Sequence, residues 1–285
     1  FTSAGKVYWL KVHQVPEAGG QARGRPIINL IQLDEGEQVR AVLPVRKFPD
    51  KEGEAYVVTC TKSGTVKKTD LTQYANPRAT GLIACGIEAG DELIAVRITD
   101  GKSDLFLTTA IGMSIRFLEE EVRAMGRAAV GVIGIKLTEE GGQKDEVVSM
   151  EVLTPGAAVL TVTERGYGKR TQESEYPRQG RAGQGVITIK TTERNGRVAA
   201  AIQVKPGDEA MIITDGGTLI RTSTDGVSEI GRNTQGVRIL NADEGERVIS
   251  VVRIAEPEGA DRANGLSVLD GAPIEGDGNP DGGVS

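Results

Sequence analysis

The stretch Leu105-Phe-Leu-Thr-Thr-Ala-Ile-Gly112-Met-Ser-Ile-Arg116 is an apolar run, a glycine turn and a second run that ends in a base. Two short apolar runs joined by a glycine turn predict a β-hairpin. The same arrangement occurs five times along the 285 residues. The five turn glycines, at spacings of 59, 48, 54 and 51 residues, are Gly5, Gly64, Gly112, Gly166 and Gly217.

Each copy continues alike after its hairpin. An arginine and glycine segment comes first, such as Arg127-Ala-Ala-Val-Gly131, and then a third apolar strand, an acidic or glycine turn and a last strand. A period near 50 residues with four strands per copy is typical of propeller blades and not of helical repeats. We therefore expect an all-β, propeller-like disc of about five four-stranded blades, with at most short helical turns near residues 119–123.

Composition agrees with a β protein that has many tight turns. The chain contains 38 glycines, and only 4% of its residues are aromatic. It has no apolar run near the roughly 20 residues that a membrane span needs, and no signal-peptide pattern at its start. Cys60 and Cys85 lie in apolar segments without CxxC spacing, so we expect reduced, buried thiols. These features predict a cytoplasmic protein.

The formal net charge of -6 is carried by the end of the chain. Residues 256–285 hold seven of the 40 acids and one of the 34 bases, so residues 1–255 hold 33 of each. A neutral body can still present one basic face. We expect a folded domain over residues 1–257 and an acidic, disordered tail over residues 258–285, because the tail is poor in large apolar residues.

The sequence offers no catalytic constellation. A single histidine, His13, excludes a multi-histidine metal site and argues against a Ser-His-Asp triad. Gly126-Arg-Ala-Ala-Val-Gly131 has the glycine spacing of a P-loop, but Val132 stands where lysine is required. We therefore expect a domain that is not an enzyme by itself and needs no cofactor.

The bases, in contrast, recur at equivalent positions of the copies. Stacked blades place equivalent loops on the same rim, so these side chains should form a curved basic edge. Any one of them taken alone is explained by a solvated charge at a strand end, but the repetition favours a binding surface. The predicted DNA-binding residues are Arg23, Arg25, Lys67, Lys68, Arg78, Arg116, Arg127, Lys169, Arg170, Arg181, Arg221 and Arg232.

An arginine-rich edge suits the phosphate backbone of duplex DNA. Arginine makes bidentate contacts to phosphate, whereas aromatic residues are too few for stacking on single strands. No helix is expected to enter the major groove. Binding should therefore be independent of base sequence and sensitive to DNA shape and bendability.

Several segments together resemble a known family. Among them are Ala22-Arg-Gly-Arg-Pro-Ile-Ile-Asn29, Gly166-Tyr-Gly-Lys-Arg-Thr171, Lys190-Thr-Thr-Glu-Arg-Asn-Gly196 and Gly231-Arg-Asn-Thr-Gln-Gly236. In this order they resemble the C-terminal domain of bacterial DNA gyrase A over residues 1 to about 257. The resemblance implies a β-pinwheel, in which neighbouring blades exchange strands.

The resemblance also implies a function. Such a domain wraps duplex DNA around its basic rim, so that ATP-driven strand passage introduces negative supercoils. The partners would be double-stranded DNA, the catalytic region of gyrase A and the whole of gyrase B, in an A2B2 enzyme of the bacterial cytoplasm associated with the nucleoid. The catalytic tyrosine and the ATPase of this type IIA DNA topoisomerase lie in its other parts.

Two departures from the family pattern limit this interpretation. The family has six repeats and the sequence shows five, which indicates that the first repeat, with its glutamine-arginine-glycine box, is missing. A box-like loop occurs in another copy, with matches at Gln179, Arg181, Gly183 and Gly185. Two alternatives stay open: the related C-terminal domain of topoisomerase IV, which selects DNA geometry, and a propeller that binds other proteins.

Overall fold

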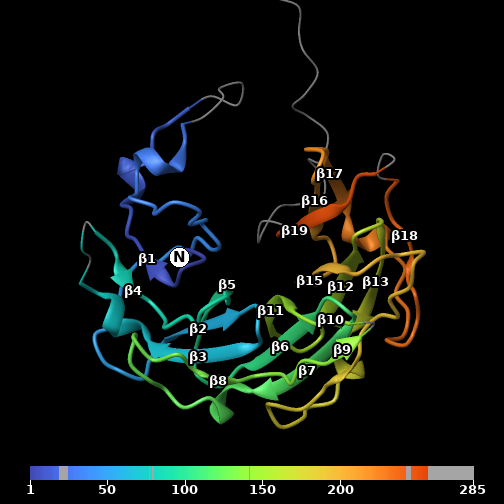
Figure 1. Cartoon of the computed structure of the whole chain (residues 1–285), viewed down its shortest axis with the longest axis horizontal. Coiled ribbons are helices and arrows are strands. Elements are labelled where there is room, and N and C mark those ends of the chain that lie inside the picture. Colours follow the sequence, from blue (N-terminus) through green and yellow to red (C-terminus); the bar gives the residue numbers. More distant parts are fainter. Residues whose placement is uncertain (19–24, 77, 79, 141, 242–244, 256–285) are drawn as a thin grey trace, which may run out of the picture. The chain divides into compact units, whose positions relative to one another are not determined.

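The computed structural model describes residues 1–18, 25–76, 78, 80–140, 142–241 and 245–255. Residues Phe1–Ala255 form one compact unit, shown in Figure 1. The tail expected at residues 258–285 lies outside the described residues. Within the described part of the chain, no helix has the length and apolar character needed to cross a membrane.

The described residues form strands and short 3-10 helices, and no α-helix occurs among them. The expected helical turn near residues 119–123 is the 3-10 helix η4. The helices are η1 (Val12–Gln14), η2 (Ile27–Asn29), η3 (Leu71–Tyr74), η4 (Glu119–Glu121), η5 (Glu173–Glu175) and η6 (Thr224–Gly226). The strands are β1 (Lys6–Val7), β2 (Tyr56–Thr61), β3 (Thr65–Asp70), β4 (Leu82–Ile83), β5 (Leu93–Thr99), β6 (Asp104–Thr109), β7 (Met113–Leu118), β8 (Val132–Ile133), β9 (Glu139–Glu140), β10 (Gln143–Lys144), β11 (Val147–Leu153), β12 (Ala158–Thr163), β13 (Tyr167–Gln172), β14 (Val186–Ile187), β15 (Val198–Val204), β16 (Glu209–Thr214), β17 (Leu219–Ser223), β18 (Val237–Arg238) and β19 (Val248–Ile254).

The predicted hairpins form at the turn glycines. Strands β2 and β3, β6 and β7, and β12 and β13 pair in antiparallel fashion around Gly64, Gly112 and Gly166. These three glycines have φ values of 85°, 90° and 75°, a left-handed conformation that glycine adopts without steric cost. The last strand of each copy, β5, β11 or β15, pairs with the first strand of its own hairpin.

Each of these sheets takes its fourth strand from the next copy. The sheet orders are β5-β2-β3-β8, β11-β6-β7-β14 and β15-β12-β13-β18. Strand β8, which follows the arginine segment of the third copy, pairs with β3 of the second, with Thr65 opposite Ile133 and Val66 opposite Val132. In the same way, β14 of the fourth copy pairs with β7 of the third, and β18 of the fifth copy pairs with β13 of the fourth. The expected exchange of strands between neighbours is therefore confirmed.

The hydrophobic core lies between successive sheets. Strands β5, β11, β15 and β19 contact one another in turn along the inner side of the arc in Figure 1. One cluster joins Val58 and Val66 of the second copy to Leu107, Ile115 and Phe117 of the third, and all five side chains are buried. A sheet that is covered on both faces needs apolar side chains on both, which explains why β6 and β12 are buried along their whole length.

The first and last copies differ from the expected four-stranded blades. The described residues contain three four-stranded sheets, one three-stranded sheet in the order β17-β16-β19, and two two-stranded pairs, β1 with β4 and β9 with β10. The strand expected at residues 39–43 is reduced to a single bridge between Val39 and Thr2. The all-β, propeller-like class is therefore confirmed, and among the described residues three of the five copies form four-stranded sheets.

Bases at the ends of the second strands join neighbouring copies. Arg116 of β7 contacts Asp104 of its own sheet and Glu173 of η5 in the next copy, both at 2.7 Å. Lys68 donates to the Glu119 carbonyl of η4 at 3.1 Å, and Arg170 pairs with Asp225 of η6 at 3.4 Å. These side chains are at most 15% exposed. Interblade contacts therefore occupy Lys68, Arg116 and Arg170, and the contact of these residues with DNA stays a prediction.

We expect Arg116→Ala to lower the free energy of unfolding by about 3 kcal/mol, because it leaves the buried carboxylate of Asp104 with less compensation. Arg221→Ala is the matched control. Arg221 occupies the equivalent position in the fifth copy, but it is 60% exposed and pairs with Glu209 of its own sheet, so its loss should cost below about 1 kcal/mol. Chemical denaturation of both variants measures the difference. Equal losses of unfolding free energy would contradict the role of Arg116 in joining neighbouring copies.

Candidate nucleic-acid interface

The loop before each exchanged strand carries one arginine that reaches the surface. These loop arginines are Arg78, Arg127, Arg181 and Arg232. Arg78 is exposed, and the other three are partly exposed. All four lie at the same point of their repeats, so the fold brings them to equivalent places on successive sheets, as the sequence predicts.

Three of the loop arginines are held in one way. The Nη1 atoms of Arg127, Arg181 and Arg232 donate to the carbonyl oxygens of the preceding exchanged strand, at 3.0, 3.2 and 2.9 Å. The accepting carbonyls belong to Ile83, Ile133 and Ile187. A guanidinium has five N–H donors, and within the described residues Arg127 and Arg232 each use one of them. Each guanidinium is thus fixed in position with donors left over for a ligand.

Backbone hydrogen bonds set consecutive loops side by side. The Lys136 amide donates to the carbonyl of Gly183 at 2.8 Å, and the Lys190 amide donates to the carbonyl of Thr234, also at 2.8 Å. Lys136 and Lys190 are exposed, so a lysine lies next to the loop of Arg181 and another next to the loop of Arg232. The sequence-based prediction omits both lysines, although each ends its third strand at the same distance from the turn glycine.

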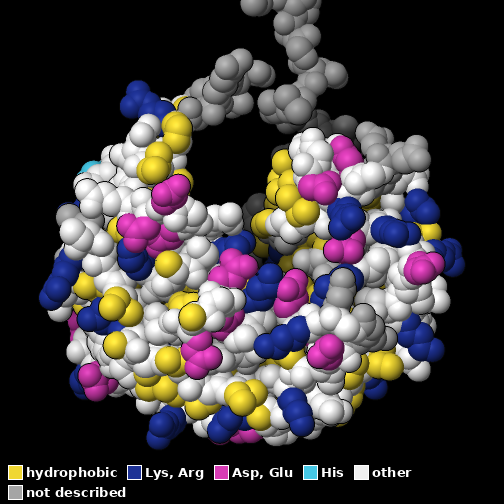
Figure 2. Space-filling view, in the orientation of Figure 1, with side chains coloured by type: hydrophobic (Ala, Val, Ile, Leu, Met, Phe, Trp, Pro, Cys, Tyr) yellow, Lys and Arg dark blue, Asp and Glu magenta, His cyan; other side chains and the backbone are white. Residues whose placement is uncertain are grey.

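A shallow groove connects the first two loop arginines. Its volume is about 460 Å³, and Arg78 and Arg127 line it together with Gln73 and Leu82. Figure 2 shows basic side chains recurring along the outer edge of the unit, with hydrophobic side chains between them. Among the hydrophobic residues of the exchanged strands, Ile83 and Ile133 are each 57% exposed. The sequence does not indicate this exposure, because these residues belong to apolar strands that otherwise point inward.

Two predicted contacts are buried lysines. Lys67 and Lys169 are 1% and 0% exposed. The Nζ of Lys67 donates to the carbonyl of Arg127 at 2.5 Å and to that of Ala84 at 2.6 Å. The Nζ of Lys169 donates to the carbonyl of Gly231 at 2.5 Å and to the carbonyl of Arg232. Each lysine thus holds the backbone of the next loop arginine from inside instead of facing outward, and its contact with DNA stays a prediction.

Burial changes the ionisation of both lysines. It lowers the pKa of Lys67 and of Lys169 to about 8. A charged ammonium loses hydration when it is buried, and the carbonyl oxygens around it replace part of that loss. The ammonium groups of Lys67 and Lys169, which support the loops of Arg127 and Arg232, therefore lose their protons near pH 8.

The family assignment follows from the repeat. The family described as "DNA gyrase C-terminal domain, beta-propeller" matches residues 1–46, 55–100, 103–154, 157–205 and 208–255, one match for each copy. The chain belongs to this family. It is 50% identical over 277 residues to the DNA gyrase A protein of Salmonella typhimurium, with 97% of the chain and 30% of that protein covered. Against the DNA gyrase A protein of Escherichia coli the identity is 48%, with the same coverage.

The chain thus spans about a third of the length of these gyrase A proteins. Solved structures agree with the fold. The chain is similar to the C-terminal domain of DNA topoisomerase IV, with a TM-score of 0.79 at 28% identity, covering 89% of the chain and 77% of that structure. It is also similar to a DNA gyrase A C-terminal domain, with a TM-score of 0.76 at 24% identity and coverages of 89% and 80%.

The box-like loop of this gyrase family member is tightly folded. Ala182 has φ 64°, a left-handed conformation, and its amide donates to the carbonyl of Gly134 at 2.7 Å. A side chain on Gly185 would place its Cβ 2.2 Å from the carbonyl oxygen of Ser114. Gln179 is anchored through its amide, which donates to the Arg116 carbonyl at 2.8 Å. The Gly183 carbonyl accepts from the Lys136 amide of the preceding copy, so backbone hydrogen bonds hold this segment where it presents Arg181.

The remaining predicted bases stand apart from this row. Arg23 lies outside the described residues, and Arg25 is exposed beside η2. Arg221 pairs with Glu209 on the last sheet. Sequence reasoning also missed Arg194 and Arg238, which flank the ring of Tyr167 at 5.1 and 4.8 Å and donate to its hydroxyl.

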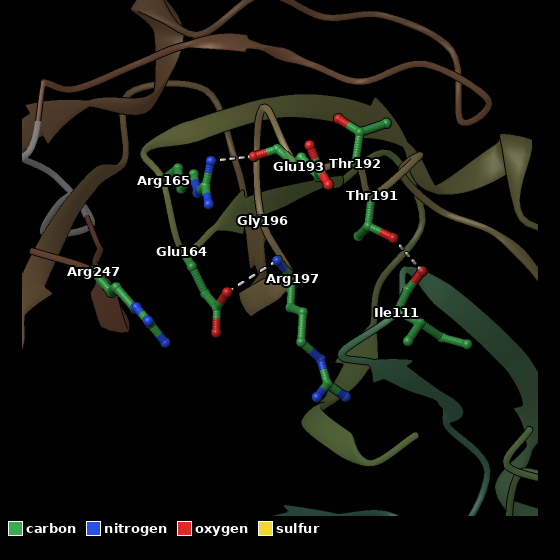
Figure 3. A pocket seen from close by; sticks show the side chains of 9 residues that line it. All are labelled: Ile111, Glu164, Arg165, Thr191, Thr192, Glu193, Gly196, Arg197 and Arg247. Atoms are coloured by element: carbon green, nitrogen blue, oxygen red, sulfur yellow. Dashed lines mark hydrogen bonds between the residues drawn. The ribbon is translucent and has the colours of Figure 1, made fainter. Parts of the chain in front are cut away.

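A second hollow lies at the hairpin turns, away from the loop arginines. Figure 3 shows Arg165, Arg197 and Arg247 there, together with the carboxylates of Glu164 and Glu193. The Arg197 amide donates to Glu164 at 3.1 Å. The charges in this hollow are of both signs, so it is a poorer anion site than the row of loop arginines.

We expect Lys169→Met to alter how stability depends on pH. The folded pKa of about 8 lies below the ordinary lysine value of 10.5, so between pH 8 and 10.5 the folded state binds fewer protons than the unfolded state. Stability therefore gains from this group as pH rises through that window, with a slope of at most about 1.4 kcal/mol per pH unit. Denaturation at several pH values should show a flatter profile for Lys169→Met than for Lys205→Met, whose exposed lysine serves as control. Parallel profiles would contradict the assignment.

Proposed function

We propose that this chain binds duplex DNA without regard to base sequence, bends it and wraps it around the edge that carries Arg78, Arg127, Arg181 and Arg232. One observation supports this most directly: loop arginines of successive repeats are anchored to equivalent carbonyls and keep donors for a ligand. Lys136 and Lys190 add charge beside the same loops.

The chemistry of this edge fits a phosphate backbone. A guanidinium forms parallel hydrogen bonds to two phosphate oxygens, and an ammonium adds a point charge. The exposed isoleucines between the arginines suit the apolar faces of the sugars. Because no α-helix occurs among the described residues, the proposed surface has no recognition helix to read base edges in the major groove. Contacts of this kind position DNA without specifying its sequence.

The repetition supplies the energy for bending. Curving 20–30 base pairs by 40–90° costs of order 1–6 kcal/mol, more than one exposed arginine can offset. Several arginines placed along an arc act on the same duplex, and each neutralised phosphate releases counterions. The arc in Figure 1 thus offers a path on which a bent duplex gains contacts that a straight one lacks.

Within the whole enzyme, the domain guides strand passage and does not catalyse it. We infer that it works with the catalytic region of gyrase A and with gyrase B, in an A2B2 assembly of the bacterial cytoplasm that is associated with the nucleoid. Its wrap presents a DNA segment with fixed handedness, so that ATP-driven passage introduces negative supercoils. Cleavage and ATP hydrolysis belong to the other parts of the assembly.

Two alternatives make different predictions. A topoisomerase IV domain selects DNA geometry and leaves no net wrap, and the likeness to such a domain keeps this alternative in view. The much higher identity to gyrase A proteins favours wrapping. A protein-binding propeller would show tight complexes with a protein partner and no dependence on the length of the DNA.

We expect the triple variant Arg127→Ala, Arg181→Ala and Arg232→Ala to weaken binding of duplex DNA at low salt. Each lost phosphate contact should reduce the log–log salt slope by about 0.9, so the slope should fall by roughly 2.7. The control is Arg97→Ala, on inner strand β5, where the arginine pairs with Glu151. Mobility shifts across a salt series measure both slopes. Equal changes in the two variants would show that the loop arginines do not form the DNA-binding surface.

Wrapping itself is tested by the topology of closed circles. Nicked circular DNA that is religated on the full chain should carry a linking difference of one sign, and this difference should shrink for the triple variant. The supercoil distribution after deproteinisation gives the result directly. Tight binding without a change in linking number would favour the geometry-selecting alternative. Weak binding without a change in linking number would mean that the edge is only a weak electrostatic surface.

A further inference from the structure

One position of the exchanged strands changes its chemistry at the last junction between copies. In β4, β8 and β14 the residue opposite the first residue after the turn glycine is an isoleucine. These residues, Ile83, Ile133 and Ile187, are 57%, 57% and 38% exposed. In β18 the same position holds Arg238, which is exposed and lies opposite Tyr167. The outer edge therefore carries a charge at this junction where the three preceding junctions are apolar.

Tyr167 holds Arg238 together with a second arginine. The Nη2 of Arg238 and the Nε of Arg194 donate to the Tyr167 hydroxyl, at 2.7 and 3.2 Å. The two guanidinium groups also lie 4.8 and 5.1 Å from the centre of the ring, within the range of a cation–π interaction. Tyr167 is 3% exposed, whereas both arginines are exposed. A buried ring thus fixes two positive charges at the surface, close to each other.

A buried asparagine shapes the turn that carries Arg194. Asn195 is 0% exposed, and its Oδ1 accepts from the Thr192 amide at 2.7 Å. Its Nδ2 donates to the carbonyls of Lys190 and Gln235, at 2.8 and 3.0 Å. Gln235 lies two residues before β18, so this one side chain connects the turn, the end of the third strand and the segment that enters the exchanged strand.

Four bases therefore meet on neighbouring segments of this junction. We call them the junction cluster: Lys190, Arg194, Arg232 and Arg238. Among the described residues none of the four forms an ion pair. Lys6, the base opposite the isoleucine of the first junction, is instead paired with Asp34 at 2.5 Å. Like charges that are close together repel, so this junction gains more from a bound anion than a place where the charges are already paired.

We propose that the junction cluster is the anchor of the DNA path, where the phosphates of a duplex bind first and most tightly. The inference rests on the DNA binding proposed above and gives the path a direction. From the anchor the duplex bends along the outer edge toward Arg78, past junctions where isoleucines stand in the place of Arg238. The weaker contacts are released and remade while the anchor holds, so the bound length varies without dissociation.

The hydrogen-bonding groups of the cluster fit phosphodiesters. A guanidinium has five N–H donors, and within the described residues Arg194 uses only its Nε. Its remaining donors form the fork that binds two phosphate oxygens in parallel. The Tyr167 hydroxyl accepts from both arginines and keeps its own proton for a third bond. Because the ring and the hydroxyl hold the guanidinium groups before DNA arrives, less side-chain freedom is lost on binding.

A duplex that is too short to bend reports the strongest local site of the full chain. About 12 base pairs are far below the persistence length of about 150 base pairs. For this probe, Arg194→Ala with Arg238→Ala should reduce the log–log salt slope by about 1.8 and the affinity at least about tenfold. Arg127→Ala with Arg181→Ala removes the same charge elsewhere on the edge and should reduce the affinity less than about threefold. Fluorescence anisotropy across a salt series measures both variants.

The outcomes separate the anchor from DNA binding as such. Equal losses in the two double variants, or a larger loss in the second, would overturn the anchor and leave DNA binding by the edge in place. No binding of any duplex by the unaltered chain would overturn the proposed function as well. Tighter binding of a polyglutamate peptide than of a duplex of equal charge would assign the cluster to an acidic protein partner.

The positioning role of Tyr167 is tested without a change of charge. Tyr167→Phe keeps the ring but removes the hydroxyl, so the affinity for the short duplex should fall about fivefold while the salt slope stays nearly constant. Tyr8→Phe is the control, because it removes a hydroxyl that donates to the carbonyl of Gln32 in the first copy, and it should change the affinity less than about twofold. Equal effects of the two substitutions would contradict the positioning role.

A crosslinker locates the short duplex directly. A photoreactive group on Asn233→Cys, beside Arg232, should capture the duplex at least about fivefold more than the same group on Gln73→Cys, which lines the groove of Arg78. Both positions are exposed, and the two native cysteines are buried and should not be labelled. Equal capture at both positions, or more at the second, would overturn the proposal.

Discussion

The structure depends on one contact that is repeated along the chain: a short strand from each copy lies against the turn glycine of the copy before it. Glycine is required there twice, once because the turn has positive φ and once because a carbonyl of the incoming strand occupies the space of a side chain. This contact sets the distance between neighbouring sheets. It also places each loop arginine, because the loop leads directly into the strand that makes the contact.

The bases of the chain serve two different purposes, and burial separates them. Lys68, Arg116 and Arg170 hold the next copy through carboxylates and carbonyls, and Lys67 and Lys169 support the loops from inside. The loop arginines and their neighbouring lysines, in contrast, face outward. A body with as many acids as bases can therefore carry a basic edge, because many of its acids are used in turns and interblade pairs.

The repeat made the fold class and the place of the loop arginines predictable from the sequence. The burial of the second-strand bases was not predictable, because a lysine such as Lys169 has the same local pattern whether it faces solvent or three oxygen acceptors. The exposure of Ile83 and Ile133 was hidden for the opposite reason, since an apolar residue in a two-residue strand has the pattern of a core position. The weak first copy was also missed, because its hairpin pattern is intact although few of its residues pair.

Since every inner copy both gives a strand to the preceding neighbour and receives one from the following neighbour, the boundaries of the repeat in the sequence and the boundaries of the sheets in space do not coincide. A duplication of one period of about 50 residues would therefore insert a complete new sheet while leaving each existing junction chemically unchanged. Growth or loss of such a domain by whole periods alters the length of its curved edge without redesign of any interface, and this gives evolution a simple way to change how much nucleic acid the edge accommodates.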